Sequence, residues 1–382
     1  MSEFTFVAEE LLQEAQNKAK LTDFGSNNFK EGVQVLCETY DNNGFNEKGR
    51  KRNRRRMLDL LQARLRIEQA FKDYPQILDE EIKAPMLLTG LPRTGTSALL
   101  NLLANDTDAR PLKLWEAMMP DPCENFQHGQ EDPRYLMMKA WQEQQNKKDP
   151  EFAKIHHTTA DTPEECIHLL NHSFQDVQFG METMMQPYAD WFQQQDLTDS
   201  YDYYFKLLQM LQWQRPGQRW LLKSPAHLWA LDQLNRLFPD CAIVITHRNP
   251  VQAVASYASM MDALMKQRDY DKKTLGPIVM EYLARKMQSS LQQRETIPQT
   301  RIFDGQFDDF VKDPVSFACQ LYDYFALPIS NRTLTAWQDF AKANPLHQHG
   351  QHQYDLQAFG LDKTCVLDRF KEYIEQFDIS VK

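Results

Sequence analysis

One short segment constrains the fold of this chain more than any other: an apolar run that ends in a glycine-rich turn. Residues 85–90 read PMLLTG, which suits a strand that is buried on both faces of a parallel sheet. Apolar residues at helical spacing follow at once, from Ala98 to Ala104. A strand, a tight turn and a helix in immediate succession predict an α/β arrangement.

The same order of elements recurs further along the chain. Three later segments each combine an apolar run with a polar residue and a proline: RWLLK before Ser224-Pro225, CAIVIT before Asn249-Pro250, and Arg301 to Phe303 before Asp313-Pro314. A polar N-cap with proline at the first helical position starts a helix. The alternation predicts a P-loop-type, three-layer α/β fold with a central parallel sheet.

The rest of the chain reads as helical additions to that sheet. With 382 residues, 42% of them hydrophobic, the chain is long enough to bury a substantial core. We expect residues 1–84 to form a helical N-terminal extension and residues 85–382 to form the α/β domain. Within that domain, residues 121–216 are rich in Gln, Met, His and Trp, which predicts a mostly helical insertion that covers a small-molecule site.

Charge and composition exclude several classes of protein. The net charge of -10 argues against a nucleic-acid-binding protein, so any phosphate site must be local. Glu3, Glu9 and Glu10 stand where a secretory signal would carry positive charge, and no apolar run approaches the roughly 18 residues of a membrane span. We therefore expect a soluble cytoplasmic protein. Six cysteines without a CxxC pair predict neither disulfides nor a structural zinc site.

One basic segment stands out against the acidic background. Lys48 to Arg56 read KGRKRNRRR. Such a run is either the solvated start of a helix or a contact for an anionic acceptor or partner, and the sequence leaves both interpretations open.

The glycine-rich turn resembles a phosphate-binding loop with its cation moved. In GLPRTGTS, Gly90, Gly95 and Ser97 reproduce the frame GxxxxGK[ST], with Thr96 in place of the lysine. Backbone N–H groups at the helix start can bind a phosphate, and Arg93 supplies charge from within the turn. The missing lysine favours a single 5'-phosphate-type group over a magnesium triphosphate. An ordinary strand-to-helix turn is the alternative.

A second anion site is indicated after the third of these strands. In THRNPVQAVASYASM, Arg248 follows the strand and Ser256 lies two helical turns further on, so the pair can bind a second phosphate. An exposed ion pair at Arg248 and simple packing at Ser256 are the alternatives. Two anion sites together indicate a bisphosphorylated nucleotide, which leaves a transferase, a P-loop kinase and a non-catalytic nucleotide-binding module as candidates.

These motifs resemble the nucleotide-binding signatures of the sulfotransferase superfamily. GLPRTGTS, LKSPAHLWALDQLNRLFPDCAIVITHRNP and the spaced Ser256 are similar to its bacterial-type branch, which is related to protein-tyrosine sulfotransferases. The resemblance runs from about Pro85 to the C-terminus and includes PEECIHLL and NPLHQHGQHQYDLQAFGL. It implies 3'-phosphoadenosine 5'-phosphosulfate (PAPS) as co-substrate, no metal, and sulfonate transfer to a hydroxyl or amine of a small, partly apolar acceptor.

The resemblance also implies a role for individual residues. The 5'-phosphosulfate would contact Arg93, Thr94, Gly95, Thr96 and Ser97, and the 3'-phosphate would contact Arg248 and Ser256. Lys223 matches a strand-end lysine that assists the sulfonate, and Glu116 is the nearest match to a glutamate base. The chemistry agrees, because the acceptor must lose a proton as it attacks sulfur while cations stabilise the departing charge.

Several of these assignments have structural alternatives. Lys223 could be a strand-end lysine that extends to solvent, and Glu116 could be a helix-surface carboxylate. Histidines are alternative bases: His156, His157, His168 and His227. His247 is expected to orient the nucleotide loop, and the histidines at 347, 349 and 352 match a loop that closes over the nucleotide, so we expect no metal there. The oligomeric state is not predicted.

Overall fold

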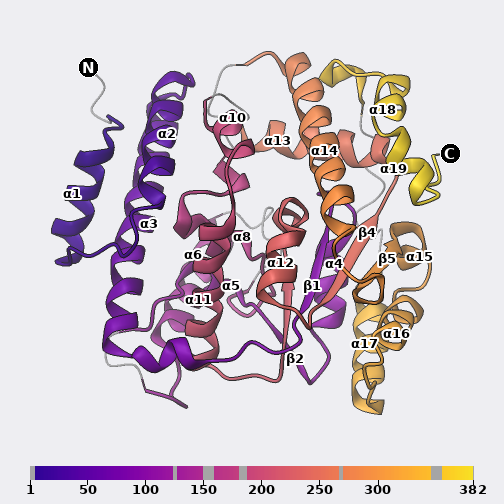
Figure 1. Ribbon diagram of the computed structural model, residues 1–382, viewed down its shortest axis with the longest axis horizontal. Coiled ribbons are helices and arrows are strands. Elements are labelled where there is room, and N and C mark those ends of the chain that lie inside the picture. The colour runs from indigo at the N-terminus through magenta and orange to yellow at the C-terminus, as the bar shows by residue number, and fades with distance from the viewer. Residues whose placement is uncertain are drawn as a thin grey trace.

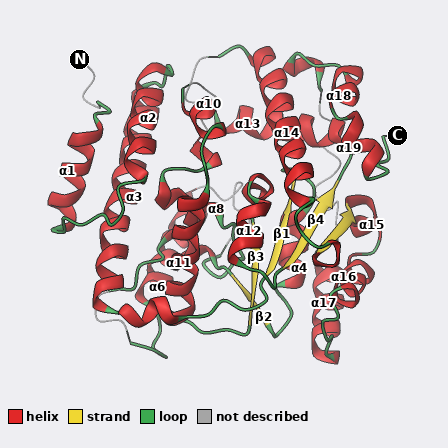
Figure 2. Ribbon diagram, in the orientation of Figure 1, coloured by secondary structure: helices red, strands yellow, loops and turns green. Residues whose placement is uncertain are grey.

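The centre of the protein is one parallel sheet. The computed structural model describes residues 5–123, 127–148, 159–179, 187–265, 270–345 and 355–381. In these, the sheet has the strand order β2-β3-β1-β4-β5. Figure 2 shows its strands in yellow. The strands are β1 (Met86–Gly90), β2 (Ala109–Pro111), β3 (Arg219–Lys223), β4 (Ala242–His247) and β5 (Ile302–Gln306). The predicted α/β class with a central parallel sheet is therefore confirmed.

Side chains of the central strands alternate between two apolar layers. Met86 and Leu88 of β1 face one cluster and Leu87 faces the other, as the period of two in a strand requires. The first layer contains α4 (Thr96–Leu103), α15 (Phe307–Lys312), α16 (Pro314–Tyr324) and α17 (Asn331–Ala343). The second contains α12 (Leu231–Leu237), α13 (Pro250–Leu264), α14 (Lys272–Arg294), α18 (Lys363–Arg369) and α19 (Lys371–Gln376). Helices on both faces give the three expected layers.

Register brings the functional ends of the strands to one edge of the sheet. Leu88 of β1 pairs with Lys223 of β3, and Gly90 pairs with Thr246 of β4. Because all strands are parallel, the turns after β1, β3 and β4 leave from the same edge. Residues that are more than 100 positions apart in the sequence are thereby placed together.

The N-terminal helices share the core of the second layer. They are α1 (Ala8–Ala19), α2 (Phe29–Asn42) and α3 (Glu47–Asp73), and they stand apart from the sheet on the far side of the insertion (Figure 1). The insertion contributes α6 (Pro133–Lys148), α8 (Ile167–Leu170), α10 (Tyr188–Gln193) and α11 (Thr198–Gln214). Buried Arg64 of α3 joins the two parts, because its Nη1 donates to the carbonyl of His172 at 2.8 Å.

Part of the basic run stabilises the packing of these helices. Within α3, Arg50 pairs with Asp41 of α2 at 2.5 Å, and Arg54 pairs with Glu14 of α1 at 2.6 Å. The run is therefore more than a solvated helix start.

Short elements complete the described chain. They are α5 (Leu114–Met118) and the 3-10 turns η1 (Pro75–Asp79), η2 (Asn171–Ser173), η3 (Pro225–Trp229), η4 (Gln299–Arg301) and η5 (Gln357–Phe359). The helix expected directly after Ser224-Pro225 is in fact η3, and α12 begins only after Ala230, whose backbone is not helical. In the part of the chain that the structure describes, no helix has the length and apolar character of a membrane span.

Candidate active site

The turn after β1 requires glycine at two positions. Gly90 has a φ of 150°, and a Cβ there would lie 2.6 Å from the carbonyl oxygen of Thr246. Gly95 has a φ of 88°, and a Cβ there would lie 2.7 Å from the ring of Phe307. Since Gly95 is also the N-cap of α4, it places no side chain over the first N–H groups of that helix. Those groups can then bind an anion.

Arg93 of the first predicted anion site contacts both residues of the second. This exposed residue has a left-handed backbone with a φ of 70°, which is strained for any residue other than glycine. Its Nε donates to Ser256 Oγ at 3.0 Å, and its carbonyl oxygen accepts from Nη1 of Arg248 at 2.7 Å. The Arg248 guanidinium also lies over the ring of Phe307, 4.2 Å from its centroid. The structure thus gathers Arg93, Arg248 and Ser256 in one place.

The remaining residues of the turn are held by short contacts within the loop and to β4. Thr94 is buried, and its hydroxyl donates to the carbonyl oxygen of Leu91 at 2.7 Å. The same hydroxyl lies 2.7 Å from Thr246 Oγ1. Thr96 is buried at the first position of α4, whereas Ser97 next to it is exposed.

Lys223 reaches this turn from the end of β3. Its side chain is only 3% exposed, so the interpretation as a lysine that extends to solvent is wrong. Its Nζ donates to Ser97 Oγ at 3.0 Å and pairs with Glu165 Oε1 at 2.5 Å. A buried ammonium group is therefore fixed between the start of α4 and a carboxylate that we did not single out from the sequence.

Glu165 is placed by the backbone of the segment that contains it. The N–H of Cys166 donates to the carbonyl of Lys223 at 2.9 Å, and the N–H of Glu164 donates to the carbonyl of Leu112 at 2.8 Å. The segment thus lies along the end of the sheet, with the Glu165 side chain 27% exposed. In the sequence, Glu165 belongs to the motif PEECIHLL. The family resemblance includes this motif but implies no role for Glu164 or Glu165.

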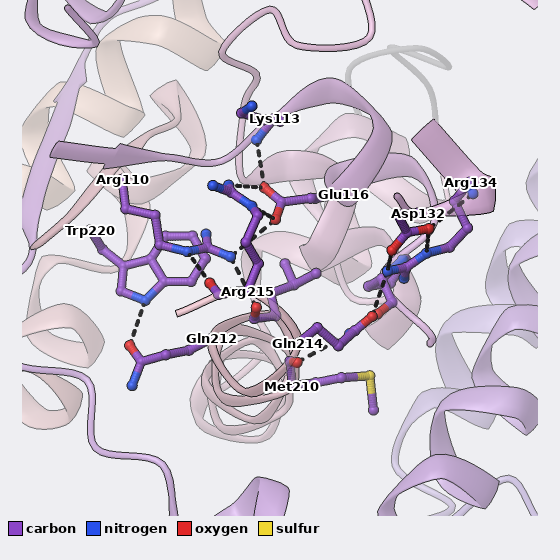
Figure 3. A network of polar contacts seen from close by, with 12 residues as sticks. Arg110, Lys113, Glu116, Asp132, Arg134, Met210, Gln212, Gln214, Arg215 and Trp220 are labelled. Atoms are coloured by element: carbon purple, nitrogen blue, oxygen red, sulfur yellow. Dashed lines mark hydrogen bonds and ion pairs between the residues drawn. The ribbon is translucent and has the colours of Figure 1, made fainter. Parts of the chain in front are cut away.

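Glu116 lies in a different network, which Figure 3 shows from close by. The side chain is 1% exposed, so it is not a helix-surface carboxylate. It accepts from Arg110 Nη2 at 3.0 Å, from Nε and Nη2 of Arg215 at 2.9 Å each, and from the N–H of Lys113 at 3.1 Å. None of these four hydrogen bonds joins it to the glycine-rich turn or to Lys223.

The network keeps Glu116 ionised. Burial favours the neutral carboxyl, but Arg110 and Arg215 more than offset it and hold the pKa of Glu116 below its usual value. Burial lowers the pKa of Arg110 to about 9, and its guanidinium stacks 3.5 Å from the Trp220 ring centroid. Protonation of Glu116 would leave a buried arginine uncompensated, which is unfavourable for a catalytic base.

The histidines that the structure describes differ in burial. His247 is buried, its Nε2 lies 2.8 Å from Asp304 Oδ1, and its ring stacks on Phe377 at 3.9 Å. His168 is partly exposed, 4.0 Å from Glu164. His227 is fully buried, with Nδ1 3.1 Å from the hydroxyl of Tyr201.

The other predicted histidines, at 156, 157, 347, 349 and 352, lie outside the described residues. Within the described ranges, no three His, Cys, Asp or Glu side chains are grouped as metal ligands.

A parallel sheet with a glycine turn and converging cations at its carboxyl edge defines a class: α/β proteins that bind an anionic group at a P-loop-type turn. The model of the sulfotransferase family matches residues 85–331. The chain belongs to this family, and the resemblance noted from its motifs is confirmed.

Solved structures agree over nearly the whole chain. Sulfotransferase STF9 from Mycobacterium avium is 25% identical, with a TM-score of 0.90, and the match covers 99% of this chain and 98% of that protein. Sulfotransferase STF1 from Mycobacterium tuberculosis H37Rv is 29% identical, with a TM-score of 0.85, and the match covers 97% and 100%. A comparison with curated proteins found no match.

Proposed function

We propose that the protein transfers sulfonate from PAPS to a hydroxyl or amine of a small, partly apolar acceptor by in-line displacement. The observation that carries the proposal is the hydrogen bond between Lys223 Nζ and Ser97 Oγ. It brings a buried cation from β3 to the start of the helix that follows the phosphate turn. A phosphosulfate bound at that turn would have the ammonium group beside its reacting end.

The nucleotide would bind through both anion sites. The 5'-phosphosulfate takes the turn, with contacts from Arg93, Thr94, Gly95, Thr96 and Ser97. The 3'-phosphate takes Arg248 and Ser256. Support comes from the mutual contacts of Arg93, Arg248 and Ser256, which hold two cations and a hydroxyl in place before the ligand arrives. Phosphate oxygens would replace the hydrogen bonds that these side chains now make to one another.

Glu165 is a better candidate for the base than Glu116. It pairs with Lys223, is partly exposed and is not enclosed by arginines. In the reaction, the acceptor oxygen or nitrogen forms a bond to sulfur while the bond from sulfur to the bridging phosphate oxygen breaks. Glu165 takes the acceptor proton, the bisphosphate leaves with the electron pair, and Lys223 and Arg93 stabilise the negative charge.

Release of 3',5'-bisphosphate from PAPS over a panel of alcohols, phenols and amines tests the proposal. We expect acceptor-dependent release that Lys223→Met lowers by at least about 100-fold. PAPS binding without transfer to any acceptor would instead favour a non-catalytic module. Magnesium-dependent ATP turnover that Arg93→Ala abolishes would favour the kinase.

A further inference from the structure

Two buried nitrogen atoms, Lys286 Nζ and His227 Nε2, have no hydrogen-bond partner in the described part of the chain. The charges of Lys286 and Lys223 both act on the His227 ring, so the three residues are neighbours. Both residues, Lys286 and His227, are fully buried. Buried polar atoms in proteins are almost always paired, because an unpaired one costs about 1–3 kcal/mol. A pair of such atoms beside a reacting lysine therefore needs an explanation.

The packing of α14 on η3 brings the side chains of Lys286 and His227 into the same region. Trp229 of η3 donates through Nε1 to the hydroxyl of Tyr282 at 3.3 Å, and its carbonyl accepts from Gln293 Nε2 at 2.9 Å. Lys286 lies one helical turn after Tyr282, on the same face of α14. His227 lies two residues before Trp229 and four after Lys223.

Both nitrogen atoms can act as hydrogen-bond donors. Burial raises the pKa of Tyr201 well above its usual value, so its phenol keeps its proton. Its hydroxyl lies 3.1 Å from Nδ1 of His227, and when the phenol donates to Nδ1 the imidazole hydrogen stands on Nε2. Burial, with the nearby charges of Lys286 and Lys223, lowers the pKa of His227 to about 3, so the ring is neutral. Lys286 adds two N–H groups as a neutral amine and three as an ammonium.

The surrounding charges do not satisfy Lys286. Glu165 and Asp176 are near enough to favour its charged form through space, but neither accepts a hydrogen bond from it. A buried amino group without hydrogen bonds is costly to retain for packing alone, since a methionine of similar volume would fill the space. Binding of a ligand would recover that cost.

We infer that Lys286 and His227 form a two-donor subsite for a negatively charged oxygen group of a reacting molecule. The group is either the sulfonate of PAPS or a carboxylate on the acceptor, because both present anionic oxygens to N–H donors. The inference rests on the proposed function. The contacts from Ser97 to Lys223 and from Lys223 to Glu165 connect the subsite to the phosphate turn.

Two measurements on Lys286→Met separate the two sources of the anion. Calorimetry compares PAPS with 3',5'-bisphosphate, which lacks the sulfonate. If the subsite binds sulfonate, the variant binds PAPS at least about 10-fold more weakly and the bisphosphate unchanged. Initial rates compare acceptors that differ only in a carboxylate or its amide. If the subsite binds the acceptor, KM for the carboxylate rises at least about 10-fold and KM for the amide does not.

Lys273→Met is the matched control, because it removes an exposed lysine from the same helix and should change none of these values. His227→Leu should weaken PAPS binding or raise the acceptor KM in the same way as Lys286→Met. His227→Gln retains an N–H donor, so its values should lie close to those of wild type. This pair decides the matter if Lys286→Met does not fold.

Unchanged PAPS affinity and unchanged acceptor KM in folded Lys286→Met and His227→Leu would overturn the inference while the proposed function stands. Wild-type protein that binds neither PAPS nor the bisphosphate would contradict both the proposed function and the inference that rests on it.

Discussion

Two glutamates near the same sheet edge have opposite surroundings. Glu116 is enclosed by Arg110 and Arg215, so its charge is neutralised within the protein. Glu165 pairs with Lys223, which also contacts Ser97 at the phosphate turn. If Lys223 turns towards an anion bound at the phosphate turn, the Glu165 carboxylate loses its ion-pair partner and can accept a proton. We therefore propose a structural role for Glu116 and the role of base for Glu165.

Replacement of Glu165 by glutamine tests its role as the base. We expect kcat to fall at least about 100-fold, because the amide cannot take the acceptor proton, with little change in the affinity for PAPS. Glu164→Gln is the control, since it removes the neighbouring carboxylate and should leave kcat within a few-fold. Equal kcat values for Glu165→Gln and wild type would exclude Glu165.

Glu116→Gln should act on stability instead. The change leaves buried Arg110 without its counter-charge, so we expect the free energy of unfolding to fall by about 3 kcal/mol. Urea unfolding measures this loss, and kcat per folded molecule should stay near the wild-type value. A large fall in kcat at unchanged stability would return the catalytic role to Glu116.

Lys286 gives the protein a defined dependence of stability on pH. Burial lowers its pKa from 10.5 to about 7, against the opposing charges of Glu165 and Asp176. Between these two values the unfolded chain binds the proton and the folded protein does not, so this group makes stability rise with pH.

The stability gained in Lys286→Met should therefore be largest at or below pH 7 and shrink towards pH 10. Urea unfolding of both proteins measures the difference, in which groups common to both, such as Lys223, cancel. A difference that does not vary with pH would mean that Lys286 titrates normally.

At the scale of elements, the turn between β1 and α4 depends on backbone that only glycine adopts easily. Gly95→Ala adds a Cβ at a φ of 88° and 2.7 Å from the ring of Phe307. We expect a loss of roughly 1–3 kcal/mol in stability and weaker PAPS binding, because the first N–H groups of α4 move. Calorimetry and thermal unfolding measure the two effects. Gly44→Ala is the control: its φ of 61° is also in the left-handed region, but nothing lies within 4 Å of a Cβ there, so the change should lower stability and leave PAPS affinity unchanged. Normal PAPS affinity in Gly95→Ala would contradict a phosphate site at this turn.

Element prediction succeeded where a local pattern carried the signal. The four apolar runs became β1, β3, β4 and β5 within a few residues of the expected bounds. The edge strand β2 was missed because Ala109–Pro111 is short and has no apolar run. The helix expected after Pro225 was displaced because η3 packs against α14, a contact that local sequence does not encode.

At the scale of the whole molecule, the sheet decides which residues meet. Motifs identified Arg93 and Ser97, which follow β1, and Lys223, which ends β3, because each lies at the carboxyl edge of the sheet. Glu165 and Lys286 could not be identified in this way, since one lies in a loop of the insertion and the other in the middle of α14. Their proximity to Lys223 depends on how the insertion and α14 pack on the sheet.

A calorimetric titration with PAPS tests the central claim most directly, with wild type, Arg93→Ala and Lys223→Met measured side by side. We predict stoichiometric binding by wild type and a loss of at least about 10-fold in each variant, because each removes a cation beside the phosphate turn. Absence of PAPS binding by folded wild-type protein, or equal affinity in all three, would contradict the account.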